Sequence, residues 1–582
     1  MTGLASTLAT IWRLAVPYFR SEDRWRGRLL LAAVIAIELS IVYINVQLNW
    51  WNARFYNALQ DHLWDAFVSE LLYFCVLAAF YIVLAVYQLY LNQWLQIRWR
   101  RWMTERYLER WLDRGNHYRM QLLGEAADNP DQRIAEDIQM FIDRTLSIGV
   151  GLLSAIVTLA SFVAILWVLS AEAPLTLFGR TWPIPGYMVW AALIYSLVGT
   201  AITHLIGRPL IDLMFGQQRY EADFRFNLVR ARENSEQIAL LAGEPAERER
   251  LMDRFSAVVA NWLGIMSRTK KLTFFTATFN QVSVIFPIIV VAPAYFAGVM
   301  QLGGLTQTAS AFGSVQASLS FFVTVYRQLA EWRAVIARLA GFDASIAQGW
   351  SAAETPPMVS VARRAGGNAI DIDTLEVNLP NGTPLVEVRD VEIPAGDRVL
   401  VTGATGSGKS TLFRAIAGIW PFGAGTILVP ESARLMILPQ RPYLPVGSLE
   451  AAVNYPAKSG TFDRAHVAEV LTAVGLPGLA QRLSEEAHWN RILSLGEQQR
   501  IGLARAILAE PDYLLLDEAT ASLDEPSEAA LYHLLYERLP HATVVSIGHR
   551  STLHAFHRRR LALTPANGRS RLQEGMIGAA AE

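Results

Sequence analysis

Cysteine is almost absent from this chain of 582 residues, whose one cysteine is Cys75. A single cysteine excludes both an internal disulfide framework and a metal site built from several thiolates. Cys75 lies in an apolar run, where a packed thiol is more common than a reactive one. Net charge is also almost absent, because 51 lysine and arginine residues balance 52 aspartate and glutamate residues. This balance gives no sign of nucleic-acid binding, so we expect no nucleic-acid partner.

Charged residues are scarce along six long stretches of the sequence. The whole chain is 52% hydrophobic with a mean hydropathy of +0.24, which is too apolar for a purely soluble protein. A helix needs roughly 20 apolar residues to cross about 30 Å of hydrocarbon. Runs of this length lie at 29–51, 70–95, 147–169, 186–206, 274–298 and 306–326. The sequence therefore predicts a membrane α-helical bundle with six spans in a lipid bilayer.

Arginine is distributed unevenly among the segments that join these runs. It is frequent in 96–146 and in 207–273, whereas 299–305 carries no charge. The positive-inside rule therefore places both long segments, the N-terminus and the chain after Tyr326 in the cytoplasm. The long inner segments are charged and contain few helix breakers, so we expect the membrane helices to continue into the cytoplasm.

The periodic pattern of the sequence changes after Phe342. Residues 343–367 have the glycine and proline content of a linker. From Ile370 onward, short apolar strands alternate with helical stretches, which is the pattern of an α/β domain. The sequence therefore predicts a transmembrane domain over 1–342, a linker over 343–367 and an α/β domain over 368–582.

The segment Gly403–Thr411 fits the phosphate-loop pattern G-x-x-x-x-G-K-[ST]. The flanking runs 398–402 and 410–417 predict the strand and the helix that this motif requires. Backbone N–H groups and the helix N-terminus can then face a phosphate, Lys409 can reach the outer phosphates, and the Ser410 hydroxyl can bind Mg²⁺. A glycine-rich turn that binds nothing is the alternative, but such turns usually lack the strand and the helix. The residues expected to bind nucleotide here are Gly403, Thr405, Gly406, Ser407, Gly408, Lys409, Ser410 and Thr411.

A second strand ends in two acidic residues. The apolar run 513–516 precedes Asp517 and Glu518. Asp517 is placed to hold Mg²⁺ through the coordination shell of the ion, and Glu518 is placed to polarise the attacking water. An acidic pair in an exposed loop is the alternative, but the apolar strand and the upstream phosphate loop favour the catalytic interpretation.

The segment Leu493–Arg500 resembles the signature motif of ABC transporters, and it precedes the acidic strand as in that superfamily. Gln440 matches the glutamine loop, Ser522–Asp524 the D-loop and His549 the switch histidine. The resemblance implies an ABC ATPase domain that binds ATP and Mg²⁺ and hydrolyses ATP with Glu518, His549 and Gln440. It also implies a set of Mg²⁺ ligands, namely Ser410, Gln440 and Asp517.

In ABC proteins the signature motif of one subunit contacts the nucleotide held by the other subunit. The resemblance therefore implies that Ser494, Gly496 and Glu497 act on the ATP of a second copy, with Asp524 of the D-loop at the interface. With one ATPase domain and six spans, the chain resembles a half-transporter. We expect it to form a homodimer that completes two ATP sites.

Two positions depart from the pattern of the family. Leu495 replaces the second glycine of the signature motif, while Ser494 and Gly496 remain. Leu379 stands where an aromatic residue usually stacks on adenine, so the base would receive an apolar contact without strong stacking. The selectivity for adenine is therefore open.

Four polar segments of the membrane half narrow the resemblance. They are 98–102, 128–137, 232–236 and 331–334. They are similar to segments of the BacA/SbmA-like peptide uptake proteins, of their ATPase-fused relatives of the YddA type and, more distantly, of the peroxisomal fatty-acyl half-transporters. The resemblance implies an exporter-like membrane fold in a bacterial inner membrane. It also implies uptake of peptides, antimicrobial peptides included, or of other bulky hydrophilic solutes such as cobalamin. Export of a lipid or acyl compound and a membrane-anchored regulatory ATPase are the alternatives.

The first span carries polar residues on one helical face. Glu38, Asn45, Asn49 and Asn52 are spaced by seven, four and three positions. A glutamate in hydrocarbon costs roughly 2.5–3.5 kcal/mol by insertion scales, so we expect Glu38 to face a cavity or a partner. Substrate contact or protonation during transport is one interpretation, and hydrogen bonding between helices is the other. The expected substrate pathway comprises Glu38, Asn45, Asn49, Gln88 and Asn92.

Overall fold

The computed structural model describes residues 2–124, 129–172, 174–177, 180–182, 184–566 and 568–576. The chain divides into two units, which are described separately. Unit 1 consists of Met1–Arg106 and Asp131–Ala340, and unit 2 consists of Tyr107–Pro130 and Gly341–Glu582. Asp128, the first residue of one polar segment used for the family resemblance, lies outside the described residues.

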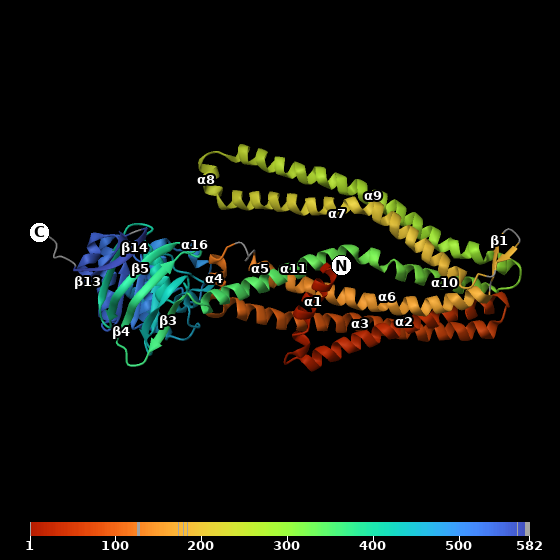
Figure 1. Ribbon diagram of the computed structural model, residues 1–582, viewed down its shortest axis with the longest axis horizontal. Helices are drawn as coiled ribbons and strands as arrows, with labels where there is room; N and C mark the ends of the chain where they lie inside the picture. The colour runs from red at the N-terminus through yellow and green to blue at the C-terminus, as the bar shows by residue number, and fades with distance from the viewer. Residues whose placement is uncertain are drawn as a thin grey trace. The chain divides into compact units, whose positions relative to one another are not determined.

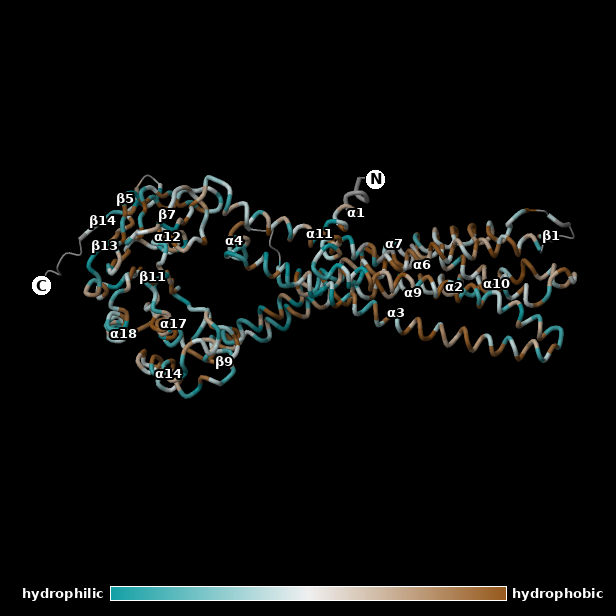
Figure 2. The backbone as a smooth tube through the Cα atoms, turned by 90° about the horizontal axis from the view of Figure 1, so that it is seen from below, coloured by the Kyte–Doolittle hydropathy of each residue, from teal (hydrophilic) through white to brown (hydrophobic). Residues whose placement is uncertain are grey.

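Unit 1 is built of long helices (Figure 1). A short hairpin of β1 (Leu175–Leu177) and β2 (Arg180–Trp182) lies between α6 and α7. Figure 2 shows hydrophobic residues along α2, α3 and α6 in the part of this unit that leads toward β1. Its helices are α1 (Thr2–Ala15), η1 (Tyr18–Arg20), α2 (Arg24–Gln60), most of α3 (Trp64–Leu112), α5 (Pro130–Gln132), the π-helix η4 (Arg133–Asp137), α6 (Ile138–Glu172), α7 (Tyr187–Glu233), α8 (Ser235–Leu240), α9 (Glu244–Phe296), α10 (Leu302–Leu319) and the first part of α11 (Phe321–Glu354).

Five helices within the described residues are long and apolar enough to cross a membrane. They are Arg24–Gln60, Trp64–Leu122, Pro130–Glu172, Tyr187–Glu233 and Glu244–Phe296. The first five expected spans lie on them, except for residues 186, 297 and 298. The sixth expected span, 306–326, is divided between α10 and α11 at Ser320. Gln307 and Thr308 are buried in α10, which packs against α2, α6 and α9. A helix covered by other helices can hold such polar residues inside a membrane. These residues lower the hydropathy of α10, which is not among the five apolar helices, so the sixth span stays a prediction.

The helices α7 and α9 are much longer than a bilayer is thick. They contain 47 and 53 residues, and a helix rises about 1.5 Å per residue, so each reaches roughly 70–80 Å. They pack on each other and are joined by α8 at one end (Figure 1). Helices of this length exceed the thickness of a bilayer, and the expectation that they continue into the cytoplasm stays a prediction.

A buried carboxylate joins α11 to the π-helix that precedes α6. Asp137 accepts hydrogen bonds from Arg338 at 2.5 and 2.9 Å and from Arg133 at 2.8 Å. Arg144 of α6 and Glu331 of α11 form a further ion pair at 2.9 Å. Two of the polar segments that carry the family resemblance therefore contain residues that join neighbouring helices.

Unit 2 contains a ten-stranded sheet with the strand order β3-β7-β4-β5-β14-β13-β6-β12-β11-β8. The neighbouring strands β6, β12, β11 and β8 are parallel, so their carboxyl ends share one edge. The strands are β3 (Val359–Arg364), β4 (Ala369–Asn378), β5 (Pro384–Pro394), β6 (Arg398–Gly403), β7 (Gly423–Pro430), β8 (Leu435–Leu438), β11 (Tyr513–Asp517), β12 (Thr543–Ile547), β13 (Arg559–Ala566) and β14 (Arg569–Met576), with a separate pair of β9 (Gly447–Ser448) and β10 (Glu486–Ala487).

Helices flank this sheet and include a group that follows β8. Val467, Leu471, Ile501 and Leu503 of this group are buried in a common core with Leu514 of β11. The helices of unit 2 are η2 (Asp113–Gly115), α4 (Asn116–Leu122), α12 (Lys409–Ile416), α13 (Leu449–Asn454), α14 (Arg464–Ala473), α15 (Pro477–Ala480), α16 (Trp489–Ile492), α17 (Leu495–Ala509), α18 (Glu525–Arg538) and η5 (Ser551–Phe556).

The segment 343–367, expected to be a linker, has regular structure over much of its length. It contains the end of α11 and strand β3, which pairs in parallel with β7. Composition alone predicted a linker because the backbone hydrogen bonds of β3 come from β7, which lies far away in the sequence.

The helix α4 belongs to unit 2, although it lies between the second and third expected spans. Tyr118 and Leu122 pack against the hydrophobic core of the sheet. The buried Asn116 side chain donates a hydrogen bond to the carbonyl of Ile346 in α11 at 3.2 Å. Gly349 allows this contact, since a Cβ there would lie 2.3 Å from the Asn116 Oδ1 atom. A segment that lies between two expected spans in the sequence thus packs within unit 2.

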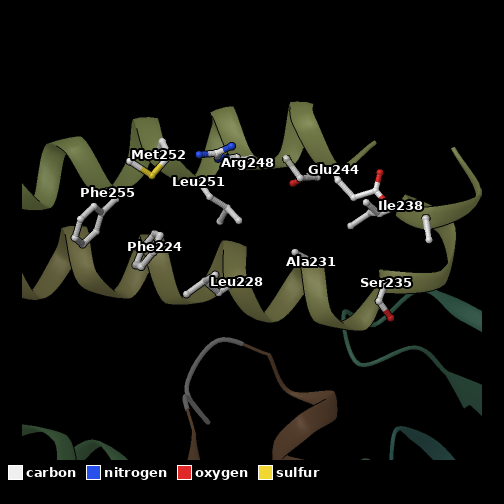
Figure 3. A pocket seen from close by; sticks show the side chains of 12 residues that line it. Phe224, Leu228, Ala231, Ser235, Ile238, Glu244, Arg248, Leu251, Met252 and Phe255 are labelled. Carbon is white, nitrogen blue, oxygen red and sulfur yellow. The ribbon is translucent and has the colours of Figure 1, made fainter. Parts of the chain in front are cut away.

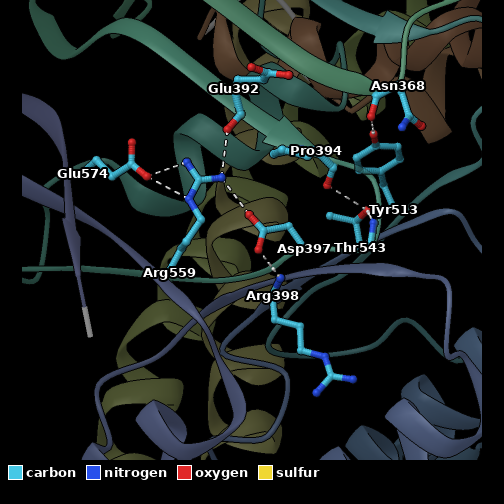
Figure 4. A network of polar contacts seen from close by, with 10 residues as sticks. Asn368, Glu392, Pro394, Asp397, Arg398, Tyr513, Thr543, Arg559 and Glu574 are labelled. Atoms are coloured by element: carbon cyan, nitrogen blue, oxygen red, sulfur yellow. Dashed lines mark hydrogen bonds and ion pairs between the residues drawn. The ribbon is translucent and has the colours of Figure 1, made fainter. Parts of the chain in front are cut away.

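A polar network holds together the strand ends opposite the shared carboxyl edge (Figure 4). Arg559 of β13 donates to Asp397 at 2.7 Å and to Glu574 of β14 at 2.8 Å. The Thr543 hydroxyl of β12 donates to the carbonyl of Pro394 at 3.4 Å. These contacts fix the starting points of β6, β12 and β13, and therefore the loops at their other ends.

Candidate active site

Three loops meet at the shared carboxyl edge of the parallel strands. The loop 404–408 follows β6, Glu518 follows β11, and His549 follows β12. Because β12 lies between β6 and β11, these loops are neighbours in space although they are distant in the sequence. Ligands of open parallel sheets bind at this edge.

The phosphate loop has the backbone conformation that its glycines allow. Gly403, Gly406 and Gly408 have φ values of +155°, +79° and +94°. A Cβ on Gly408 would lie 2.4 Å from the Cγ2 atom of Val386. Positive φ therefore favours glycine at all three positions, and lack of space excludes a side chain at Gly408 as well.

Lys409 begins α12 and is 6% exposed. Its ammonium group donates to the carbonyls of Gly403 and Ala404 at 2.9 and 3.0 Å. Burial lowers the pKa of Lys409, and the carboxylates of Glu518 and Asp517 oppose this shift. The lysine therefore lies across its own loop, with its charge next to the position of a bound phosphate.

Ser410 and Asp517 meet as expected for two groups that share a metal ion. The Ser410 hydroxyl donates to the Asp517 Oδ1 atom at 2.7 Å. Burial raises the pKa of Asp517, and the hydrogen bond from Ser410 opposes this shift. Mg²⁺ is commonly held by one or two protein oxygens together with substrate phosphates, and this pair fits that role. Within the described residues there is no cluster of three or more His, Cys, Asp or Glu side chains that could hold a metal alone.

The three residues expected to catalyse hydrolysis converge on one carboxylate. The Gln440 side-chain amide donates to the Glu518 Oε2 atom at 2.9 Å, and the His549 Nε2 atom lies 3.4 Å from Oε1. Glu518 has a φ value of +50°, which is unusual for a residue other than glycine. Gln440, expected also as a Mg²⁺ ligand, contacts Glu518 in this structure. The positive φ of Glu518 is a backbone conformation that is typical of functional sites.

The signature motif forms the start of α17. Ser494 is its N-cap, and it shares a capping box with Glu497 through bonds of 3.3 and 2.8 Å. The Glu497 carboxylate therefore stabilises the helix start. Gly496 packs beside the D-loop, because a Cβ there would lie 3.3 Å from the Leu523 Cδ2 atom.

The two remaining nucleotide-site residues lie in loops next to these elements. Leu379 follows β4 and packs, half-buried, against the core of the sheet. An aliphatic contact is thus available where the adenine ring is expected. Asp524 is the residue before α18 and ends the D-loop.

The side chains of the expected substrate pathway make hydrogen bonds between helices. Asn49 is buried and exchanges two hydrogen bonds with Gln307 of α10, at 3.1 and 3.2 Å. Glu38 of α2 accepts a hydrogen bond from Gln88 of α3. These contacts fit the helix-to-helix interpretation. Within the described residues, the buried Oδ1 atom of Asn92 lacks a hydrogen-bond partner, and Asn45 is partly exposed.

The sequence did not point to two polar residues that hold the D-loop. Arg550, which directly follows His549, donates to the carbonyls of Leu523 and Ala521 at 2.6 and 3.1 Å. Gln499 lies in the signature motif and contacts the same loop. Their positions beside motif residues were the available signal. Their backbone partners in the D-loop, which are two carbonyls for Arg550 and the N–H of Ser522 for Gln499, are revealed only by the fold.

Two families of known proteins match this chain. Residues 14–296 match ABC transporter transmembrane region 2, and residues 387–521 match the ABC transporter family. The chain is 33% identical over 539 residues to the Inner membrane ABC transporter ATP-binding protein YddA of Escherichia coli. The aligned region covers 92% of this chain and 94% of that protein. It is 28% identical over 511 residues to the Lysosomal cobalamin transporter ABCD4 of Homo sapiens. That aligned region covers 80% of this chain and 79% of that protein.

A solved structure of a bacterial Atm1-family ABC exporter with ATP bound has the same fold, with a TM-score of 0.73 and 18% identity. The match covers 94% of this chain and 95% of that chain. This confirms the predicted fold class, which is an exporter-like helical membrane domain followed by an α/β ABC ATPase domain. The chain belongs to the ABC transporter family, as a member with both domains in one polypeptide. It binds ATP, and its ATP hydrolysis is coupled to transport across a membrane.

Proposed function

We propose that this protein is an ATP-driven importer of peptides, antimicrobial peptides included, or of other bulky hydrophilic solutes such as cobalamin. It works as a homodimer in a bacterial inner membrane, with both termini in the cytoplasm. The membrane domain covers 1–342 and the ATPase domain 368–582. The observation that carries the proposal is the convergence of Gln440 and His549 on Glu518, beside a phosphate loop that opens at the carboxyl edge of the sheet.

The ATP chemistry follows from the positions of these groups. Lys409 and the backbone of 403–411 bind the phosphates, with Leu379 against the adenine. Ser410, Asp517 and Gln440 would hold Mg²⁺, which neutralises charge on the phosphates. Glu518 accepts a proton from the attacking water, while His549 and Gln440 orient that carboxylate.

A second copy is needed because one chain carries one phosphate loop and one signature motif. In the proposed dimer, Ser494 and Gly496 of one copy face the nucleotide held by the other, with Asp524 at the interface. Ser494 caps the N-terminus of α17, and the positive end of this helix suits a phosphate of that nucleotide. The family resemblance supplies this arrangement, and the half-transporter layout supports it.

The surface of the α7–α8–α9 hairpin supports the same dimer. An apolar cavity of about 560 Å³ lies between α7 and α9 near α8, and Phe224, Leu228 and Phe255 point into it (Figure 3). Leu240 and Leu241 beside it are 79% and 82% exposed. Apolar surface of this kind needs a partner in water, and a second copy can cover it.

Polar groups in the spans support a hydrophilic cargo. Glu38, Gln88 and Asn92 lie within the expected spans on α2 and α3, where polar residues are rare without a function. The similarity to a lysosomal cobalamin transporter, together with the resemblance of four segments to BacA/SbmA-like proteins, supports the same class of cargo.

Export of a lipid or acyl compound is the second candidate. An apolar cavity of about 570 Å³ between α7 and α9 is lined by the rings of Tyr195, Phe279 and Phe286. A cavity of this size and lining can hold an acyl chain. A membrane-anchored regulatory ATPase is the third candidate, from another functional class.

A gene deletion tested against several translocated antimicrobial peptides separates these candidates. Resistance of the deletion strain supports import, and hypersensitivity supports export. Complementation with the unmodified gene should restore the phenotype, whereas a Glu518→Gln gene should not, which ties the effect to ATP hydrolysis. Purified protein that hydrolyses ATP in liposomes but moves no peptide, cobalamin or lipid would support the regulatory ATPase.

A further inference from the structure

Gln499 is a buried side chain that joins two loops of the ATPase domain. It extends from α17 and is 1% exposed. Its Nε2 atom donates to the backbone carbonyl of Gln440 at 3.0 Å, and its Oε1 atom accepts from the backbone N–H of Ser522 at 3.0 Å. Both ends of one amide are therefore used, one on the glutamine loop and one on the D-loop.

The two loops carry different parts of the hydrolysis machinery. The side chain of Gln440 donates to Glu518, so the carbonyl that Gln499 holds belongs to the residue that orients this carboxylate. The D-loop packs on the signature glycine, since a Cβ on Gly496 would lie 3.6 Å from the Ser522 carbonyl oxygen. Gln499 thus sets the separation between the group that holds Glu518 and the segment beside the signature motif.

A second contact holds the far side of the D-loop. Arg550 donates to the carbonyls of Ala521 and Leu523, which flank Ser522. The Arg550 guanidinium also lies 3.5 Å from the buried carboxylate of Glu528. With Arg550 on one side, the hydrogen bond that the Ser522 N–H donates to Gln499 determines where the other side of the loop lies.

We propose that Gln499 is a positioning residue for ATP hydrolysis. It holds the glutamine loop and the D-loop at a fixed separation, so that Glu518 and the signature motif reach their working positions together. This inference rests on the proposed dimer, because the signature motif of one copy acts on the nucleotide of the other. It requires neither a particular cargo nor a direction of transport.

The Gln499→Met variant tests this proposal in the full-length protein reconstituted in lipid nanodiscs. Methionine has a similar shape but removes both hydrogen bonds. We expect kcat for ATP hydrolysis to fall about tenfold, which equals about 1.4 kcal/mol in activation free energy, while KM for ATP changes less than about twofold. The matched control is Tyr536→Phe, which removes the hydrogen bond from Tyr536 to the carbonyl of Phe556, 2.7 Å long, and should leave kcat unchanged.

If Gln499 only stabilises the fold, a different result is expected. The fall in kcat then matches a fall in the melting temperature of the variant, or kcat and KM for ATP change together. Either result overturns the proposal. An unchanged kcat also overturns it. If Gln499→Met does not fold, Gln499→Glu keeps the acceptor for Ser522 and loses the donor to Gln440. The same fall in kcat at constant KM is then expected, and a normal kcat overturns the proposal.

Failure of the proposed dimer gives a distinct result. The mass of the unmodified protein in nanodiscs then corresponds to one copy. A dimeric protein that hydrolyses ATP but transports none of the tested solutes leaves the Gln499 measurement fully informative, because its readout is ATP hydrolysis.

Discussion

The Gln440 side-chain amide donates to the Glu518 carboxylate at 2.9 Å, from the loop after β8 to the loop after β11. These strands are parallel neighbours, so the two loops emerge at the same edge. His549 approaches the other oxygen of the same carboxylate from the end of β12. Three segments that are far apart in the sequence therefore orient one group, and that group is the proposed acceptor of the proton from water.

Replacing Glu518 with glutamine tests this role. The amide cannot accept the proton, so ATP hydrolysis should fall by about 10²–10⁴-fold. Binding of ATP should persist, because Lys409 and the phosphate loop are unchanged. Phosphate release and nucleotide binding, measured on the same sample, check the prediction. A hydrolysis rate close to that of the unmodified protein would show that another group is the base.

Two glycines of the phosphate loop offer a matched pair of alanine variants. Both have positive φ, but a Cβ on Gly408 meets Val386 at 2.4 Å, whereas a Cβ on Gly406 meets no atom within 4 Å. Positive φ costs a non-glycine residue about 1–3 kcal/mol, and only Gly408→Ala adds a steric clash. Gly408→Ala should therefore weaken ATP binding more than Gly406→Ala does. Equal dissociation constants for a fluorescent ATP analogue would contradict the observed loop conformation.

The buried His557 predicts a dependence of stability on pH. Its ring nitrogens contact the Leu553 carbonyl at 2.7 Å and the Ser546 hydroxyl at 2.8 Å, and burial lowers its pKa from 6.5 to about 4. Between these pH values the unfolded chain binds more protons than the folded chain. The stability that neutral His557 contributes, about 3 kcal/mol, is therefore complete above pH 6.5 and is lost as the pH falls toward 4.

The variant His557→Gln measures this contribution. Glutamine does not titrate in this range, so its unfolding free energy should change less between pH 7 and pH 5 than that of the unmodified protein. Denaturation at each pH gives the two slopes. Identical slopes would mean that His557 is not held neutral by burial.

The contact between Asn49 and Gln307 separates the two interpretations of the polar face on α2. If the pair joins helices, the variants Asn49→Leu and Gln307→Leu should be non-additive in stability, with a coupling of about 0.6–2 kcal/mol. Transport in the double variant should then follow its stability. A loss of transport without a coupling energy would favour direct contact between Asn49 and the cargo.

Leu379 predicts weak selection of the nucleotide base. An aliphatic side chain gives adenine and guanine similar contacts, so ATP and GTP should be hydrolysed with similar KM values. The variant Leu379→Tyr adds a ring that can stack on the base, worth about 1–3 kcal/mol, and KM for ATP should fall. The same KM for ATP in both proteins would show that the base does not lie on Leu379.

The strand, loop and helix around Gly403–Thr411 were predictable because their signals are local. The spacing of Gly403, Gly408 and Lys409 defines a loop between a strand and a helix, and parallel strands bring their carboxyl ends to one edge. The hydrogen bonds of Gln499 and Arg550 could not be predicted, because their partners are backbone groups. A backbone carbonyl leaves no trace in the side-chain sequence.

The membrane half was less predictable for a related physical reason. Hydropathy identifies helices that face lipid, but α10 is covered by other helices and holds Gln307 among its buried residues. The segment 343–367 resembled a linker because the hydrogen bonds of β3 come from β7. In both places distant contacts stabilise residues whose local composition indicates something else.

The central claim is that a complete ATP site combines the phosphate loop of one copy with the signature motif of a second. Crosslinking tests it most directly, with cysteines at Ala404 and Ser494 in a background carrying Cys75→Ser and Glu518→Gln. We expect disulfide-linked dimers to form when ATP is added and to be absent without nucleotide. Chains that stay uncrosslinked with ATP, or a disulfide formed within a single chain, would contradict it.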